Sequence, residues 1–153
     1  MIRTEKIPGD QSEAITIGTE AEGSARRLLL VEDDRSLRRY LEVVLRREGF
    51  EVSVAADGLE AMRVLLATPI DIVVTDAIMP HLNGHELIRF LRGTPALAEI
   101  RVVLLSALEN KETEHDQCRA NVYLAKPVSP EELIGCLEGL PGPKSKPSPK
   151  SKV

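Results

Sequence analysis

The fold is decided by the stretch Ile70-Asp-Ile-Val-Val-Thr-Asp76-Ala-Ile-Met-Pro80-His-Leu-Asn-Gly84. Its first part is rich in Ile and Val and lies between Pro69 and Pro80, which is typical of a strand buried on both faces in a parallel sheet. The run ends in Asp76, and a buried carboxylate costs free energy unless a partner lies close to it. Asp76 therefore predicts a cation, a metal ion or hydrogen-bond donors at the end of this strand.

The length and composition of the chain limit its class. With 153 residues, 42% of them hydrophobic, the chain can bury one core, so we expect one folded domain. No apolar run approaches the roughly 18 residues of a membrane span and no export signal is visible, so we expect a cytoplasmic protein without membrane insertion. Cys118 and Cys136 lie far apart without metal-site spacing, and we interpret both as structural thiols.

The three segments of the chain differ in pattern and charge. Residues 1–25 show no periodicity and predict a disordered extension, residues 26–140 form the folded domain, and the Pro/Ser/Lys-rich residues 141–153 predict a disordered basic tail. The formal charge is −4, and because the tail contains four lysines and no acid, the rest carries −8. An acidic body argues against nucleic-acid binding, which requires a basic face, and the tail lysines more often keep a chain solvated than bind a ligand.

Apolar periodicity predicts strands alternating with helices. The expected strands are residues 28–31, 52–54, 70–76, 102–105 and 122–124. The expected helices carry Leu37, Tyr40, Leu41, Val44 and Leu45 before Gly49, then Leu59, Met62, Leu65 and Leu66, then residues 84–92, and last Leu133, Ile134, Leu137 and Leu140 after a capping box from Ser129 to Glu132. Residues 107–121 have no apolar stripe, so a helix there would be short or loose. The alternation predicts an α/β fold with a five-stranded parallel sheet.

Polar residues follow four of the expected strands. Glu32, Asp33 and Asp34 follow the first, Asp76 the third, Ser106 the fourth and Lys126 the fifth. Because ligands of parallel sheets bind beyond the carboxyl ends of the strands, these side chains are expected at one site. We interpret Asp34 as the cap of the first helix rather than as a ligand.

The chemistry of this site indicates phosphoryl transfer. The carboxylates of Glu32, Asp33 and Asp76 would repel one another without a hard divalent cation, and oxygen ligands suit Mg²⁺. Lys126 adds a positive charge and Ser106 a hydroxyl donor, so that a phosphoryl group could be received. Asp76 would be the nucleophile, and the product would be an aspartyl phosphate.

Four motifs carry a resemblance to a known family. VEDD at 31–34, TDAIMPHLNG at 75–84, LSA at 105–107 and YLAKP at 123–127 resemble the response-regulator receiver domain of two-component signalling, over about residues 26–140. The resemblance implies a flavodoxin-like strand order 2-1-3-4-5 with helices on both faces of the sheet. It also implies that Asp33 and Asp76 bind Mg²⁺ directly, with Glu32 acting through water and the backbone carbonyl of Ile78 as a further ligand.

The resemblance also implies roles in signalling. Ser106 and Lys126 would hold the phosphoryl oxygens, and Tyr123 would be the switch aromatic that turns inward when Ser106 moves. The chain would be no enzyme beyond its own phosphorylation and dephosphorylation. A histidine kinase or a histidine phosphotransfer protein would supply the phosphoryl group, and a single-domain regulator or phosphorelay intermediate of this kind would signal to a downstream target protein, with homodimerisation left open.

Particular positions in the sequence argue against two classes of enzyme. A phosphatase of the dehalogenase type would have a second Asp where Ile78 stands, and a nucleotide-binding enzyme would have a glycine-rich loop in place of residues 32–34. A phosphorylation-independent adaptor stays an alternative, because residues 107–121 depart from the family pattern. The resemblance implies that Ile78 and Leu108 occupy the two variable positions that flank the phosphoryl group, and because both are apolar we hypothesise a long-lived phosphoryl form. We assign no ligand or catalytic role to the histidines at 81, 85 and 115.

Overall fold

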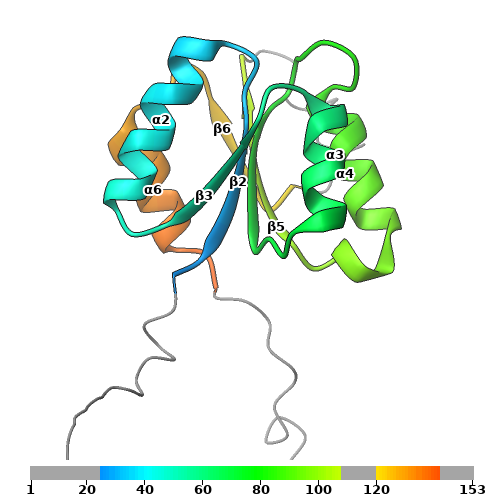
Figure 1. Ribbon diagram of the computed structural model, residues 1–153. Coiled ribbons are helices and arrows are strands. Elements are labelled where there is room, and N and C mark those ends of the chain that lie inside the picture. The colour runs from blue at the N-terminus through cyan, green and yellow to red at the C-terminus, as the bar shows by residue number, and fades with distance from the viewer. Residues whose placement is uncertain (1–24, 108–119, 142–153) are drawn as a thin grey trace, which may run out of the picture.

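A computed structural model describes residues 25–107 and 120–141 of the chain (Figure 1). Strands and helices alternate along these residues, as the sequence predicts. The elements are β2 (Arg27–Val31), α2 (Arg35–Arg47), β3 (Glu51–Ala55), α3 (Gly58–Ala67), β4 (Ile72–Asp76), α4 (Gly84–Gly93), the short 3-10 helix η2 (Pro95–Leu97), β5 (Arg101–Ser106), β6 (Val122–Ala125) and α6 (Pro130–Glu138).

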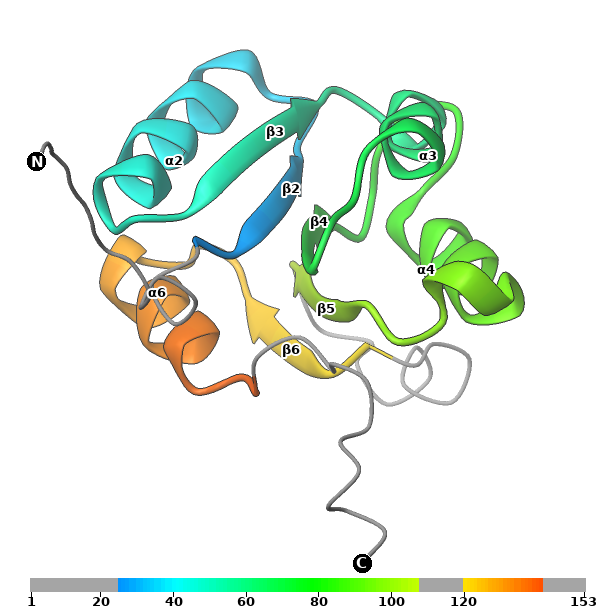
Figure 2. The ribbon, with the colours of Figure 1, turned by 60° about the horizontal axis from the view of Figure 1, so that its bottom comes forward.

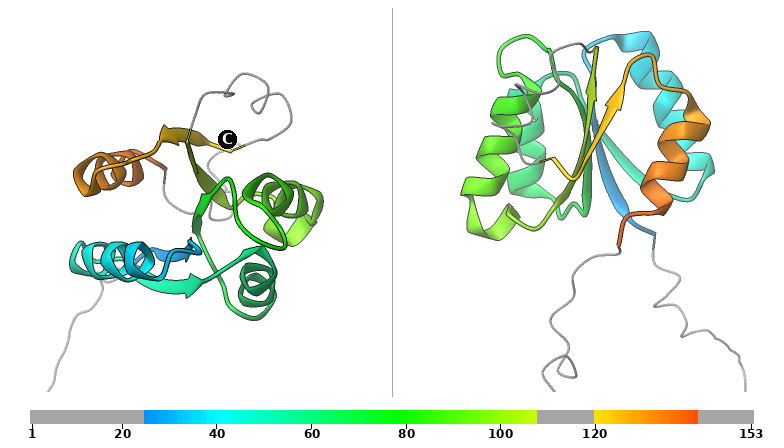
Figure 3. Two further views of the ribbon diagram at one scale, coloured as in Figure 1. Left: turned by 90° about the horizontal axis from the view of Figure 1, so that it is seen from above. Right: turned by 180° about the vertical axis from the view of Figure 1, so that it is seen from behind.

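The strands form one parallel sheet in the order β3-β2-β4-β5-β6. Counted along the chain this is the order 2-1-3-4-5, so the predicted fold class is confirmed. Helices α2 and α6 cover one face of the sheet and α3 and α4 cover the other (Figures 2 and 3). All five carboxyl ends therefore point to one edge, which is the upper edge in Figure 1.

Two apolar clusters fill the space between the sheet and its two helical layers. Successive strand residues point to opposite faces, so Leu28 and Leu30 pack with Leu41 and Leu133 on the α2 and α6 side. Leu29 packs with other buried residues on the α3 and α4 side. This double burial explains why the central strands are apolar throughout rather than alternating.

The ends of the helices are capped largely as predicted. The Asp34 side chain accepts a hydrogen bond from the Leu37 amide at 2.9 Å, which confirms Asp34 as the cap of α2. Ser129 accepts from the Glu132 amide at 3.0 Å and so supplies its half of the predicted capping box. A box with both halves present, between Asn83 and Glu86, begins α4, where none was predicted.

The buried faces of two helices differ from the prediction. Tyr40 was expected on the apolar stripe of α2 but is exposed, because α2 packs on the sheet through Leu41 and Leu45. Leu59 and Leu66 of α3 are also exposed. The buried side of α3 instead runs through Gly58, Ala61 and Leu65, and the small residues Gly58 and Ala61 leave room for close packing. Apolar character alone therefore misplaced the inner face of α3.

Several predicted features lie outside the described residues. These are almost all of the extensions 1–25 and 141–153, most of residues 107–121, and with them Leu108, His115 and Cys118. Cys136 is described, is half-buried, and packs beside the core under α2 and α6, as expected of a structural thiol. No helix within the described ranges is long and apolar enough to cross a membrane.

Candidate functional site

The residues predicted for the site come together at the carboxyl edge of the sheet. Glu32 directly follows β2, Asp76 is the last residue of β4, Ser106 ends β5, and Lys126 follows β6. Glu32 is 1% exposed and Asp76 is 3% exposed, whereas Asp33 faces solvent. Two buried carboxylates at the ends of neighbouring strands need compensation from nearby groups.

Part of that compensation comes from Lys126. Its Nζ donates a hydrogen bond to Asp76 Oδ1 at 2.8 Å and lies 3.9 Å from Glu32 Oε1. The Lys126 amide also donates to the Ser106 carbonyl at 2.8 Å, which continues the pairing of β5 and β6 and fixes the lysine backbone at this edge. Lys126 lies fifty positions from Asp76 along the chain and supplies the positive charge that we expected beside the Asp76 carboxylate.

The three acids are close enough to share a cation. One oxygen each from Glu32, Asp33 and Asp76 lies within 4.8 Å of the others. Glu32 Oε2 accepts from the Asp34 amide at 3.1 Å, but the buried Oε1 has no hydrogen-bond partner among the described residues. A buried carboxylate oxygen without a hydrogen-bond partner, beside two further carboxylates, is a suitable ligand for a hard divalent ion such as Mg²⁺.

Burial and mutual contacts shift the pKa values of Glu32, Asp76 and Lys126. Burial raises the pKa of Glu32 from 4.5 to about 7, and the charge of Asp76 adds to the rise. Burial also raises the pKa of Asp76, although the bond from Lys126 opposes that change. Burial acts to lower the pKa of Lys126, but its bond to Asp76 prevails and the pKa is raised. The site therefore favours a bound positive charge.

The loop between Asp76 and α4 is held against the sheet by close backbone contacts. The Gly84 amide donates to the Ala77 carbonyl at 2.9 Å, and the Ala77 amide donates to the Leu105 carbonyl at 2.8 Å. A Cβ atom at Gly84 would overlap the carbonyl oxygen of Asp76. Position 84 thus needs glycine for space, while Ile78, two residues beyond Asp76, has an exposed side chain.

Tyr123 lies on the edge strand β6, where it pairs in register with Leu104 of β5. Its half-buried side chain packs against the core on the α3 and α4 side. Ser106 lies two residues beyond Leu104 on β5, and the switch role of Tyr123 stays a prediction.

Some contacts of the site could not be found from the sequence. Arg38 of α2 donates from its guanidinium to the Glu32 carbonyl at 2.8 Å. His81 forms an ion pair with Asp57, with 3.2 Å between Nδ1 and Oδ2. Both contacts join residues whose spacing shows no motif, so no sequence signal indicated them.

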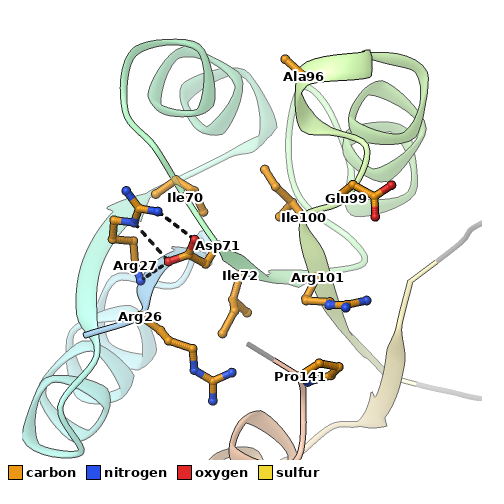
Figure 4. A pocket seen from close by; sticks show the side chains of 10 residues that line it. All are labelled: Arg26, Arg27, Ile70, Asp71, Ile72, Ala96, Glu99, Ile100, Arg101 and Pro141. Atoms are coloured by element: carbon orange, nitrogen blue, oxygen red, sulfur yellow. Dashed lines mark hydrogen bonds and ion pairs between the residues drawn. The ribbon is translucent and has the colours of Figure 1, made fainter. Parts of the chain in front are cut away.

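A hollow of about 270 Å³ lies at the other end of the strands (Figure 4). Its main polar feature is the pair of Arg27 and Asp71, in which the Arg27 guanidinium donates to both carboxylate oxygens at 2.9 and 3.1 Å. The Arg27 amide donates to Asp71 as well, at 2.9 Å. Although burial acts to raise the pKa of Asp71, these bonds lower it. None of the predicted site residues lines this hollow.

The parallel sheet in the order 2-1-3-4-5, with an acidic cluster paired to a lysine at its carboxyl edge, is the arrangement of a class of signalling domain. The family described as the response regulator receiver domain matches residues 28–138, and the chain belongs to this family. A receiver domain takes part in phosphorylation-dependent signalling and is not an enzyme in the ordinary sense.

Individual relatives agree with the family. "Probable transcriptional regulator ycf29" of Porphyra purpurea is 36% identical over 118 residues, which cover 74% of this chain and 55% of that protein, so the chain spans about half the length of such relatives. Chemotaxis response regulator CheY4 of Vibrio cholerae is 28% identical, with a TM-score of 0.71 and coverage of 75% and 98%. The receiver domain of sensor histidine kinase PA1611 from Pseudomonas aeruginosa, which holds a magnesium ion in its active-site cleft, is 30% identical, with a TM-score of 0.69 and coverage of 75% and 96%.

Proposed function

We propose that the chain is a signalling switch in which Asp76 accepts a phosphoryl group from a histidine kinase or a histidine phosphotransfer protein. The observation that carries the proposal is the buried carboxylate of Asp76, bonded to Lys126 at 2.8 Å and accompanied by Glu32 and Asp33. A carboxylate so placed has both a cation to orient it and acids to hold a metal ion beside it.

The transfer is a substitution at phosphorus. One carboxylate oxygen of Asp76 attacks the phosphorus atom of a phosphohistidine, and a P–O bond forms as the P–N bond breaks. The electron pair of the broken bond stays on the donor imidazole. Lys126 and the Ser106 hydroxyl hold phosphoryl oxygens in the product, and attack by water later releases phosphate and restores the Asp76 carboxylate.

The metal ligands that we assign are the carboxylates of Glu32, Asp33 and Asp76 and the backbone carbonyl of Ile78. Bound Mg²⁺ would neutralise charge that develops on the phosphoryl oxygens. The orphaned Oε1 atom of Glu32 supports the assignment, as does the magnesium ion in the related PA1611 domain.

The output that we propose is a change in protein contacts. A new bond from Ser106 to the phosphoryl group would draw its hydroxyl toward Asp76 and let Tyr123 turn inward, so that the surface beside β6 changes. That surface would bind a downstream target protein. A second copy of the chain as partner and the cytoplasmic location stay predictions from the sequence.

The test is phosphorylation by acetyl phosphate with Mg²⁺, followed by intact-mass measurement. The parent, Asp76→Asn and a matched control, Asp34→Asn, are compared. Asn caps a helix as well as Asp does, so the control removes an acid from the same edge without removing a proposed site residue. We expect one added phosphoryl group on the parent and the control and none on Asp76→Asn.

Two results would contradict this proposal. An unmodified parent would favour the phosphorylation-independent adaptor, and a modified Asp76→Asn protein would show that another residue is the acceptor.

A further inference from the structure

The loop that follows Asp76 is tied to the amino end of α3 by a side-chain contact. His81 lies in the middle of this loop, residues 77–83, and its Nδ1 atom is 3.2 Å from Oδ2 of Asp57. A second contact lies beside it, because a Cβ atom at Gly58 would overlap the Leu82 carbonyl oxygen. The loop and the first turn of α3 are therefore in close contact at two adjacent points.

His81 adopts an unusual backbone conformation to make this contact. Its φ angle is 69°, and it is the only residue other than glycine with a positive φ in the described chain. Such a conformation costs free energy in most residues and persists where the surroundings hold it in place. The contact of the His81 imidazole with Asp57 can stabilise this backbone conformation.

A hydrogen bond from α3 fixes the orientation of the Asp57 side chain. Its Oδ1 atom accepts a hydrogen bond from the Glu60 amide at 2.8 Å as the cap of α3, which leaves Oδ2 for the imidazole. Glu60 is itself fixed by a bond of 2.8 Å from the Ala56 amide to its Oε1 atom. The first turn of α3 thus offers a rigid acceptor at one place.

We propose that His81 is a positioning residue for phosphoryl transfer, which acts through Asp57 to fix the loop that carries Ile78 beside Asp76. The proposal rests on the proposed function, because the loop matters only if Asp76 is phosphorylated. His81 touches no reacting atom. It sets the path of the backbone whose carbonyl at Ile78 is assigned to the metal.

The experiment compares phosphorylation rates of five full-length proteins with acetyl phosphate at subsaturating and at saturating Mg²⁺. They are the parent, His81→Asn, Asp57→Asn, the double variant and the control His85→Asn. Asn tolerates a positive φ and also caps helices, so the two substitutions remove the contact between imidazole and carboxylate while sparing the backbone and the α3 cap. The melting temperature of each protein is measured to check that all five are folded.

The result expected is a ratio that depends on Mg²⁺. At subsaturating Mg²⁺ the parent should react roughly two- to fivefold faster than His81→Asn, as for an exposed pair, and at saturating Mg²⁺ the rates should converge. Asp57→Asn and the double variant should match His81→Asn, and His85→Asn should match the parent.

Failure takes two distinguishable forms. Equal rates at subsaturating Mg²⁺ in proteins that are all phosphorylated on Asp76, or losses that add in the double variant, overturn the role of His81 alone. A parent that gains no phosphoryl group overturns the proposed function and this role together.

Discussion

Replacing Glu32 by glutamine should stabilise the metal-free protein at neutral and alkaline pH. Folding raises the pKa of this carboxyl from 4.5 to about 7, first because it is buried and second because Asp76 is near. A raised carboxyl pKa favours folding fully below the unfolded value and loses that contribution as pH rises through the folded value. The parent should therefore lose stability between about pH 4.5 and pH 8, whereas glutamine does not titrate.

The size of the effect follows from the shift in pKa. Each pKa unit corresponds to about 1.4 kcal/mol, so Glu32 costs the metal-free fold about 3 kcal/mol above pH 8. Glutamine has nearly the same shape, keeps an oxygen for the Asp34 amide, and removes the negative charge that is shared with the unpartnered Oε1 atom. We expect the two proteins to differ by about 3 kcal/mol at pH 8 and by little at pH 4.5.

The assay is urea unfolding in EDTA across this pH range, with the free energy of unfolding taken from the midpoint and slope. Glu48→Gln, a substitution at the exposed end of α2, is the matched control and should follow the parent. If Glu32→Gln is no more stable than the parent at pH 8, or if the difference does not shrink toward pH 4.5, the buried-charge reasoning is refuted.

Three further substitutions test other parts of the structure. Gly84→Ala should lower the free energy of unfolding by about 2 kcal/mol, because the new methyl group overlaps the Asp76 carbonyl. An unchanged melting temperature would contradict this. Asp71→Asn should cost about 1 kcal/mol at pH 7, a small value because its partner Arg27 is partly exposed and the pair is screened. The loss should shrink as pH falls below 3.8 and through the lowered pKa of the folded carboxyl, which urea midpoints across that range measure. Ile78→Asn should shorten the lifetime of phosphorylated Asp76 by admitting water, and an equal decay rate in a mass time course would exclude Ile78 as a barrier.

The fold and the grouping of the site residues could be predicted because both depend on simple patterns. A strand buried on both faces is apolar throughout, so an acid at its end, such as Asp76, is conspicuous. Parallel strands then bring Glu32, Ser106 and Lys126 to the same edge without any knowledge of side-chain geometry. The 2.8 Å contact of Lys126 with Asp76 is the consequence.

Other features depend on geometry that spacing does not encode. The positive φ of His81 and the bond from Arg38 to the Glu32 carbonyl arise from how a loop and a helix meet the sheet. Leu59 and Leu66 are exposed because α3 is buried through Gly58, Ala61 and Leu65, and the Gly58 backbone lies against the Leu82 carbonyl. Such contacts decide which side of an apolar helix is buried, and apolar periodicity cannot resolve them.

Binding of Mg²⁺ should release protons near neutral pH, and this provides an independent measure of the acidic pocket. Because the pKa of Glu32 is about 7, the metal must displace a proton below that pH, so affinity should fall by up to about tenfold for each pH unit. Calorimetry in two buffers with different ionisation enthalpies counts the protons, with a further fraction expected from Asp76, whose pKa is also raised. The Glu32→Gln variant should release fewer protons on Mg²⁺ binding, because glutamine has no carboxyl proton to lose.

The same proton governs both the unfolding free energy without metal and the affinity for metal. Linkage therefore requires the pH range over which the metal-free parent loses stability to coincide with the range over which Mg²⁺ affinity rises. If stability falls with pH as expected while Mg²⁺ affinity stays constant, Glu32 is a buried charge but not a ligand. The metal would then be held by Asp33 and Asp76 without it.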